Sequence, residues 1–294
     1  MILTRLAWKK LGSMTSLKAF DEKRGSLMKS ISFEETKQIE LEILLKFAGF
    51  CDQHNLRYYL TYGSLIGAVR HKGFIPWDDD IDVQMPRADY NRLISIFNVQ
   101  NENKELFLID PKAKNAAHPF AKIVDTRTVK KELGAKKGSI LGIDIDVFPV
   151  DGMPSNDAEY DKWSEKLRAC YKKFQFANTG LKGLPFKTKV HMLLYKVYVP
   201  FKKSLLKKAN KLHALYPYET CEYVGTIEMM YNSKKNRLKK EYFEGYSLVE
   251  FEGHFLKAHK DYDAVLSGIY GDYMKLPPED QQVTHHVNVS YWKE

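Results

Sequence analysis

Four aspartates gather within five positions of the chain, at Asp78, Asp79, Asp80 and Asp82. Like charges this close repel one another unless a cation neutralises them. Strand-like alternation would put Asp80 and Asp82 on one face and their apolar neighbours on the other. Carboxylate oxygens are the ligands that Mg²⁺ prefers, so we expect a divalent-metal site here.

A second carboxylate-bearing segment lies at residues 143–148, where Asp144 and Asp146 alternate with apolar residues. This pattern predicts a strand with one buried face and one face that carries both carboxylates. Two carboxylates from one strand and a third from its neighbour can hold one or two Mg²⁺ ions while leaving positions for water and phosphate. Asp80 and Asp82, with either Asp144 or Asp146, meet that need.

A Gly-Ser pair precedes the aspartates. Residues 57–62 are rich in strand formers and lead directly into Gly63 and Ser64. Gly63 lets the backbone approach a ligand closely, and the amides at Ser64 and Leu65 open a short helical stretch, residues 65–70, that can face a phosphate. Phosphoryl transfer from a nucleotide depends on such phosphate contacts and metal ions, with little covalent help from the protein.

The order of strand, Gly-Ser, helix and Asp-x-Asp is the signature of the nucleotidyltransferase superfamily, and residues 62–82 closely resemble the LicD family. That family includes bacterial phosphorylcholine transferases and is related to fukutin-type sugar-phosphate transferases. Residues 145–152 and 270–278 resemble two further segments of the family. The chain is therefore similar to this family from about residue 33 to residue 286.

The resemblance implies a role for each matched position. Asp80, Asp82 and Asp146 would be the catalytic carboxylates and the metal ligands; Asp146 is preferred because the family segment keeps an acid there, while Asp144 would assist. The implied cofactor is Mg²⁺, as two ions, with Mn²⁺ as the alternative. Asp78 and Asp79 would orient the metal site or cap the turn. The substrate-binding residues would be Gly63, Ser64, Arg70, Lys122 and His286.

The resemblance also implies a reaction and its partners. A phosphorylcholine or similar phospho-alcohol would move from CDP-choline or a related CDP-alcohol to a hydroxyl of a cell-surface glycan precursor, with release of CMP. The acceptor would be an anionic glycan or lipid-linked precursor of teichoic acid or lipopolysaccharide. Two other functions stay open: a nucleotidyltransferase that moves a nucleoside monophosphate and releases pyrophosphate, and a non-catalytic nucleotide-binding module.

Two further classes are disfavoured by the residues themselves. The Asp78-Asp79-x-x-Asp82 spacing also matches the Asp-rich motif of prenyl-diphosphate enzymes, but that motif belongs on a helix, and Pro76 and the β-branched residues that follow favour a strand. A pI of about 9.1 suggests nucleic acid. The lysines, however, concentrate beside apolar residues rather than with arginine on an aromatic platform, so no nucleic-acid partner is expected.

Composition indicates a globular protein, with 44% hydrophobic and 28% charged residues among 294. We predict an α+β fold in which residues 31–152 form a nucleotidyltransferase-like core with a mixed β-sheet and flanking helices. An N-terminal arm, residues 1–30, would precede it. A helix-rich portion that binds the acceptor, residues 153–294, would pack on the core.

The net charge of +9 is concentrated in residues 181–211, which contain nine lysines and no acidic residue. This stretch is either an amphipathic surface for an anionic membrane or polyanion, or a packed helix pair with a solvated lysine face. No apolar run is long enough to predict a membrane span. Three widely spaced cysteines favour a reducing interior. The expected location is cytoplasmic, peripheral at the inner face of the membrane.

Overall fold

The computed structural model of the protein describes residues 28–113, 116–132, 141–181, 186–228, 234–284 and 288–293. These residues form an α+β fold around a mixed β-sheet, as predicted. Most of the predicted N-terminal arm, residues 1–27, lies outside the described residues, and so does His286.

The central sheet contains nine strands among the described residues, and its main path runs β10-β11-β2-β3-β7-β5-β4. The pairs β3–β7 and β11–β2 are parallel, and the other pairs are antiparallel. Strands β8 and β9 extend the end of β7. The bounds are β2 (Tyr59–Leu60), β3 (Asp82–Pro86), β4 (Leu106–Ile109), β5 (Ala121–Asp125), β7 (Asp144–Met153), β8 (Tyr223–Gly225), β9 (Leu238–Lys239), β10 (Tyr246–Phe251) and β11 (His254–His259).

A smaller sheet joins the two ends of the described chain. Its strands are β1 (Ser30–Ile31), β12 (Asn288–Trp292) and β6 (Thr128–Glu132), and β12 lies between the other two in antiparallel pairing. The indole Nε1 of Trp292 donates a hydrogen bond to Glu35 Oε1 at 3.0 Å. The C-terminal strand is thereby tied to the start of the first described helix.

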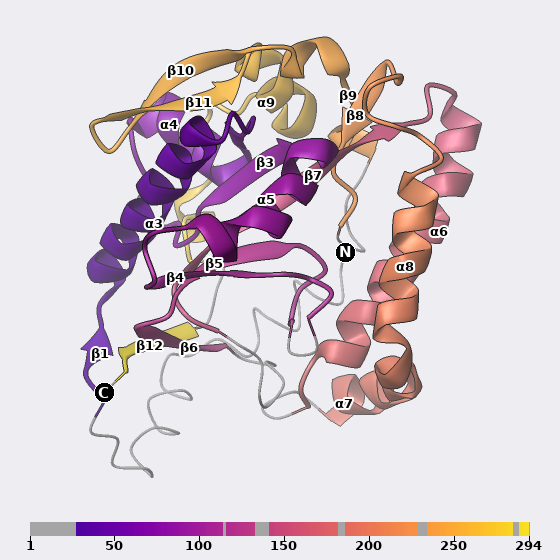
Figure 1. Cartoon of the computed structure of the whole chain (residues 1–294), viewed down its shortest axis with the longest axis horizontal. Coiled ribbons are helices and arrows are strands. Elements are labelled where there is room, and N and C mark those ends of the chain that lie inside the picture. The colour runs from indigo at the N-terminus through magenta and orange to yellow at the C-terminus, as the bar shows by residue number, and fades with distance from the viewer. Residues whose placement is uncertain are drawn as a thin grey trace.

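The helices lie around the central sheet (Figure 1). The α-helices are α3 (Phe33–Gln53), α4 (Tyr62–His71), α5 (Arg87–Gln100), α6 (Asp157–Asn178), α7 (Phe186–Leu193), α8 (Lys202–His213) and α9 (Tyr262–Tyr270). The 3₁₀ helices are η1 (Leu194–Phe201), η2 (Lys234–Asn236), η3 (Lys240–Phe243) and η4 (Glu279–Gln281). Helix α3 begins with a capping box, in which Ser32 Oγ accepts from the Glu35 amide and Glu35 accepts from the Ser32 amide.

Alternation along β3 and β7 sorts their side chains between the two faces of the sheet. Helices α3 and α5 cover the apolar face, and the rings of Phe50 in α3 and Phe97 in α5 lie 4.9 Å apart. Each apolar side chain that is fully buried contributes about 1.5–3 kcal/mol to folding. The buried set from these strands and from the residues just before them includes Ile81, Val83, Met85, Ile143, Ile145 and Val147. The opposite face therefore carries the aspartates.

The predicted strand at residues 57–62 is shorter in the structure, where β2 covers only Tyr59–Leu60. Tyr62 already begins α4, and its φ of 48° lies in the left-handed region, which ends the extended backbone. The Arg57 side chain is held instead by Asp89, whose Oδ2 lies 2.6 Å from Nε.

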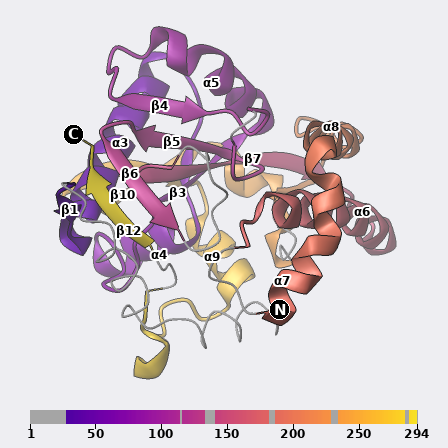
Figure 2. The same cartoon turned by 90° about the horizontal axis from the view of Figure 1, so that it is seen from below.

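Helices α6, α7 and α8 stand together beside the sheet, as Figures 1 and 2 show. Helices α6 and α8 share a separate apolar cluster, and the chain then returns to the central sheet as β8 to β11. The predicted boundary at residues 152–153 falls at the end of β7. The portion after it supplies this helix group and also four strands of the central sheet.

One part of the Lys-rich stretch, residues 181–211, fits a packed helix with a solvated lysine face, and another part fits an exposed amphipathic surface. Helix α8 packs through Leu206 and Ala209, so its lysines form a solvated face, whereas α7 and η1 bury no residue. Several of their apolar side chains stand in solvent, with Phe186 80% and Leu194 70% exposed, while Tyr195 packs on Phe176 of α6. Among the described residues, no helix combines the length and apolar character needed to cross a membrane.

Candidate active site

Three neighbouring strands present charged side chains in one row. Asp82 opens β3 and is the register partner of Asp146 in the parallel strand β7. On its other side, Asp146 is the register partner of Lys122 in β5. Adjacent strands lie about 4.8 Å apart, so these three groups share one neighbourhood on the face that the apolar side chains leave free.

Asp144 is neutralised by lysines. Lys122 Nζ lies 2.5 Å from both Asp144 Oδ2 and Asp146 Oδ1, and Lys130 forms an ion pair with Asp144 as well. Burial opposes ionisation of Asp144, but Lys122 and Lys130 together lower its pKa below the ordinary value. Asp146 keeps the more accessible carboxylate, 17% exposed against 2% for the Asp144 side chain. The preference for Asp146 as a ligand is consistent with this arrangement and stays a prediction.

Asp82 has the most strongly raised pKa in the row. Burial raises its pKa well above the ordinary value, Asp80, Asp146 and Asp78 raise it further, and Lys122 opposes them. The site thus holds more carboxylates than the neighbouring lysines neutralise, which is the electrostatic character of a cation site.

Asp146 has a smaller shift from the same causes. Burial and the adjacent Asp144 raise its pKa to about 6, while Lys122 works in the other direction. Asp80 lies on the loop before β3 rather than on the strand itself. In the part of the chain that the structure describes, Asp80, Asp82 and Asp146 do not each place one carboxylate oxygen within 4.8 Å of an oxygen of the other two. The structure therefore brings the three predicted ligands into one region without defining their coordination.

The start of α4 is tied to the carboxylate strand. Ser64 Oγ accepts a hydrogen bond from the Asp82 amide at 2.8 Å, and the Thr61 amide donates to the Asp82 carbonyl at 3.1 Å. At Gly63, a Cβ atom would lie 2.5 Å from Asp78 Oδ2, so a side chain there would displace the aspartate. Asp78 thus lies against the first turn of α4, where the helix dipole favours a negative charge.

A buried carboxyl from α3 joins this region, and the sequence interpretation missed it. Glu40 is 2% exposed, and its Oε2 has no hydrogen-bond partner among the described residues. Burial raises its pKa, Asp80 and Asp144 add to the rise, and Lys130 opposes it. Glu40 therefore lies near enough to Asp80 and Asp144 for their charges to act on its pKa, although α3 covers the apolar face of the sheet. In the sequence, Glu40 stands at helical spacing from Ile43. A charged residue on the apolar stripe of a helix could therefore have indicated a buried functional carboxyl.

Aromatic side chains border the carboxylates. Phe148 follows Asp146 by two residues on the same face, and its ring lies 5.7 Å from that of Tyr62 and 4.4 Å from that of Phe120. Tyr270 is 44% exposed, yet desolvation, with Tyr62 and Asp82, raises the pKa of its hydroxyl. Tyr270 presents the most exposed of these rings, whereas Phe148 and Phe120 are 8% and 3% exposed and pack against each other. Tyr58 and Tyr59 are core residues, each 2% exposed.

The structure does not bring Arg70 to the carboxylates. It lies in the last turn of α4, about 10 Å along the helix from Gly63. Its guanidinium donates to the Tyr273 carbonyl at 2.8 Å and to His71 Nε2 at 2.9 Å. A substrate contact for Arg70 stays a prediction, as does the role of His286, which lies outside the described residues.

Comparison with known proteins defines the class of this site. The LicD/FKTN/FKRP nucleotidyltransferase domain matches residues 55–175, which contain the carboxylate row and the Gly-Ser turn. Over 268 residues, the chain is 33% identical to the lipopolysaccharide cholinephosphotransferase LicD of Haemophilus influenzae, covering 90% of this chain and 99% of that protein. Such identity over nearly the whole length shows common family membership.

More distant similarity extends to other proteins. Mannosyltransferase regulator 4 of Saccharomyces cerevisiae is 28% identical over 134 residues, which cover 44% of this chain and 11% of that protein. An uncharacterized protein of Rickettsia typhi is 36% identical over 63 residues, 21% of this chain and 20% of its own. The protein is a phosphotransferase enzyme of the nucleotidyltransferase-domain class. Within that class it belongs to the LicD family, so the resemblance inferred from its motifs is confirmed.

The raised pKa of Asp82 predicts that this residue destabilises the metal-free protein at neutral pH. A group whose folded pKa is raised loses its stabilising contribution as the pH rises through that pKa. In EDTA at pH 7, Asp82→Asn should therefore increase the free energy of unfolding by about 0.5–2 kcal/mol. Urea unfolding monitored by circular dichroism measures this free energy.

The matched control for this prediction is Asp161→Asn, which changes an exposed carboxylate on α6. It should leave the unfolding free energy nearly unchanged. If Asp82→Asn lowers stability, or stabilises no more than the control, the repulsion inferred at the carboxylate row does not exist.

Proposed function

We propose that the protein transfers phosphorylcholine, or a similar phospho-alcohol, from CDP-choline or a related CDP-alcohol to a hydroxyl of a cell-surface glycan precursor, with release of CMP. The observation that carries this proposal is the row formed by Asp82, Asp146 and Lys122, in a family whose Haemophilus influenzae member is named a lipopolysaccharide cholinephosphotransferase. By that relative's name, a lipopolysaccharide sugar is the first acceptor to test, and teichoic acid is the second.

The proposed cofactor is Mg²⁺, as two ions, with Mn²⁺ as the alternative, and Asp80, Asp82 and Asp146 would hold it. All three supply carboxylate oxygens, and burial together with Asp80, Asp146 and Asp78 raises the pKa of Asp82, so a bound cation would stabilise its ionised form. When bound, the metal would neutralise the diphosphate of the donor.

The remaining side chains would position the donor and stabilise its charge. Lys122 supplies a fixed ammonium group beside the carboxylates, within reach of a phosphate oxygen at the same site. The first-turn amides of α4 at Gly63 and Ser64 would face phosphate through the positive end of the helix. Tyr270, which is 44% exposed and near enough to Asp82 for that carboxylate to raise its pKa, would offer a ring face for the cytosine or the trimethylammonium group.

Turnover should require Asp82 and Asp146. With Mg²⁺, CDP-choline and a lipopolysaccharide acceptor fraction, we expect release of CMP and phosphorylcholine on the acceptor, both measured by mass spectrometry. Asp82→Asn and Asp146→Asn should each lower the rate by about 10³-fold, because each removes a proposed ligand of the metal that would neutralise the transition state. The exposed-site variant Asp161→Asn should retain the wild-type rate.

Two results would contradict the proposed reaction. Release of pyrophosphate from CTP, without CMP from any CDP-alcohol, would favour transfer of a nucleoside monophosphate. Undiminished turnover in Asp82→Asn would remove this residue from the metal set.

Binding of Mg²⁺ should depend on pH through Asp146. Its pKa is raised from 3.8 to about 6, so the metal-free protein loses stability as the pH rises between those values. A protonated carboxyl does not bind metal, so Mg²⁺ should raise the melting temperature more at pH 7.5 than at pH 5. At roughly 100 times its Kd, a ligand contributes about 2.7 kcal/mol.

Differential scanning fluorimetry with and without Mg²⁺ measures this effect at both pH values. In Asp146→Asn, the increase caused by Mg²⁺ should be small and nearly independent of pH. An equal increase at pH 5 and pH 7.5 in the wild type would show that Asp146 does not bind the ion.

We also propose that α7 and η1 place the enzyme on the cytoplasmic face of an anionic membrane, where a lipid-linked acceptor would lie. Exposed apolar residues in this segment, among them Phe186 and Leu194, can enter the lipid headgroup region while the lysines of residues 181–211 face anionic lipids. Each lysine near such a surface contributes about 1 kcal/mol.

Co-sedimentation with liposomes tests this docking. The protein should bind vesicles that contain phosphatidylglycerol and should not bind neutral phosphatidylcholine vesicles. High salt should release it from the anionic vesicles, because salt screens the electrostatic attraction. The double variant Phe186→Ser/Leu194→Ser should bind less tightly. Val99→Ser removes an apolar side chain that is 76% exposed on α5 and should bind like the wild type. Equal binding by the double variant would exclude this segment.

A further inference from the structure

A second cluster of potential ligands lies away from the carboxylate row. Asp151 stands near the end of β7, His213 is the last residue of α8, and Glu228 follows β8. Asp151 is five positions after Asp146 along the strand, and at 3.3 Å per residue the distance between them is about 16 Å. An odd spacing also puts these two side chains on opposite faces of the sheet, so the clusters are separate.

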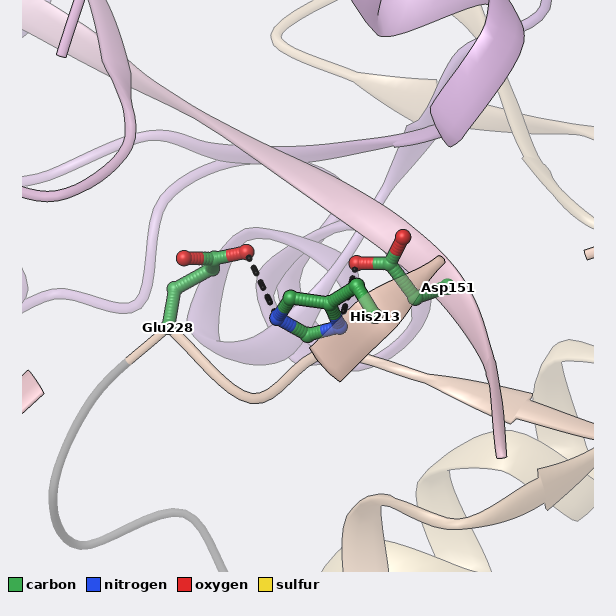
Figure 3. Close-up of side chains that lie close together, drawn as sticks. All are labelled: Asp151, His213 and Glu228. Atoms are coloured by element: carbon green, nitrogen blue, oxygen red, sulfur yellow. Dashed lines mark ion pairs between the residues drawn. The ribbon is translucent and has the colours of Figure 1, made fainter. Parts of the chain in front are cut away.

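The imidazole of His213 lies between the two carboxylates, as Figure 3 shows. His213 Nδ1 is 3.1 Å from Asp151 Oδ2, and Nε2 is 3.7 Å from Glu228 Oε1. Each of the three residues exposes no more than 4% of its surface. One ligand atom from each lies within 4.8 Å of the other two, and no other group of three does so in the described part of the chain.

The ring is oriented so that one nitrogen remains without a hydrogen bond. Tyr171 Oη lies 3.0 Å from His213 Nε2, whereas Nδ1 has no hydrogen-bond partner among the described residues. A hydrogen bond to the far ring nitrogen is the outer-shell contact that fixes metal-binding histidines. The tyrosine thus leaves Nδ1, beside Asp151, as the available donor atom.

The cluster lies in the lining of a pocket. A cavity of about 670 Å³ lies between α5 and α8, and its lining includes all three residues together with Tyr171 and Tyr216. Three protein ligands beside such a space leave coordination positions for water.

Arg87 is the group that now balances the carboxylates. Its Nε lies 2.7 Å from Asp151 Oδ1, and its terminal nitrogen lies 2.5 Å from Asp151 Oδ2 and 3.1 Å from Glu228 Oε1. A bound cation must compete with that terminal nitrogen for Oδ2 and Oε1, while the bond from Nε to Oδ1 can persist. Asp151 would then be oriented by Arg87 as it binds the ion.

We propose that Asp151, His213 and Glu228 form a second cation site, which takes a first-row divalent transition metal such as Co²⁺ or Zn²⁺ rather than Mg²⁺. An imidazole nitrogen with two carboxylates suits these ions, whereas Mg²⁺ prefers oxygen ligands and retains its waters. The three ligands come from β7, α8 and the segment after β8, so the ion would fasten the helix group to the sheet. This proposal is independent of the proposed transfer reaction.

Co²⁺ is the probe, because its absorption and electron paramagnetic resonance report its ligands. The full chain carrying Asp82→Asn, which weakens the carboxylate row as a competing site, should bind one equivalent of Co²⁺ that excess Mg²⁺ does not displace. Pulsed resonance should show coupling to an imidazole nitrogen. Adding His213→Asn should abolish this coupling and weaken binding by about 100-fold, since loss of an outer-shell partner alone costs about 10–100-fold.

His254→Asn changes an exposed histidine and should leave both signals intact. Circular dichroism checks that each variant is folded. Glu228→Gln, which keeps the side-chain shape, provides a second test and should also weaken Co²⁺ binding. Absence of nitrogen coupling in the Asp82→Asn protein would overturn the proposal, as would its persistence after His213→Asn or displacement of Co²⁺ by Mg²⁺.

Discussion

The register of β3 against β7 is the constraint on which the rest of the structure depends. Val83 and Val147 are fully buried register partners on the face that α3 and α5 cover. If one strand slipped by one residue, its apolar side chains would move to the opposite face of the sheet. Packing on that face therefore fixes the position of Asp82 beside Asp146 on the other. The apolar core provides the free energy that holds two like charges together, and the site obtains its geometry from it.

The lysines around the row do not distribute their charge evenly. Lys122 and Lys130 both contact Asp144, which is buried and held ionised, whereas Asp82 and Asp146 keep raised pKa values. A structural salt bridge would lower the pKa of each acid in it. The row thus combines Asp144, whose charge the lysines neutralise, with Asp82 and Asp146, whose charges are not fully neutralised. Perturbed pKa values of this kind are characteristic of functional sites.

Strand β7 connects this chemistry to the opposite side of the molecule. Its first residues carry Asp144 and Asp146, and its last residues, which pair with β8, carry Asp151, which Arg87 and His213 contact. Arg87 directly follows β3, and His213 ends α8, so the buried charges join the core to the helix group. The two parallel strands at the centre of the sheet therefore organise both the carboxylate face and the attachment of the C-terminal portion.

The sequence by itself determined the family, the fold class and the local elements, because these depend on residues within a few positions of one another. The alternation through Asp144 and Asp146 and the Gly63-Ser64 pair ahead of the aspartates are both of this kind. Only the tertiary structure decided that Glu40 joins the aspartates, that Lys130 pairs with Asp144, and that His213 meets Asp151 and Glu228. These contacts join segments far apart in the chain, and the burial that makes them strong exists only once sheet and helices have packed.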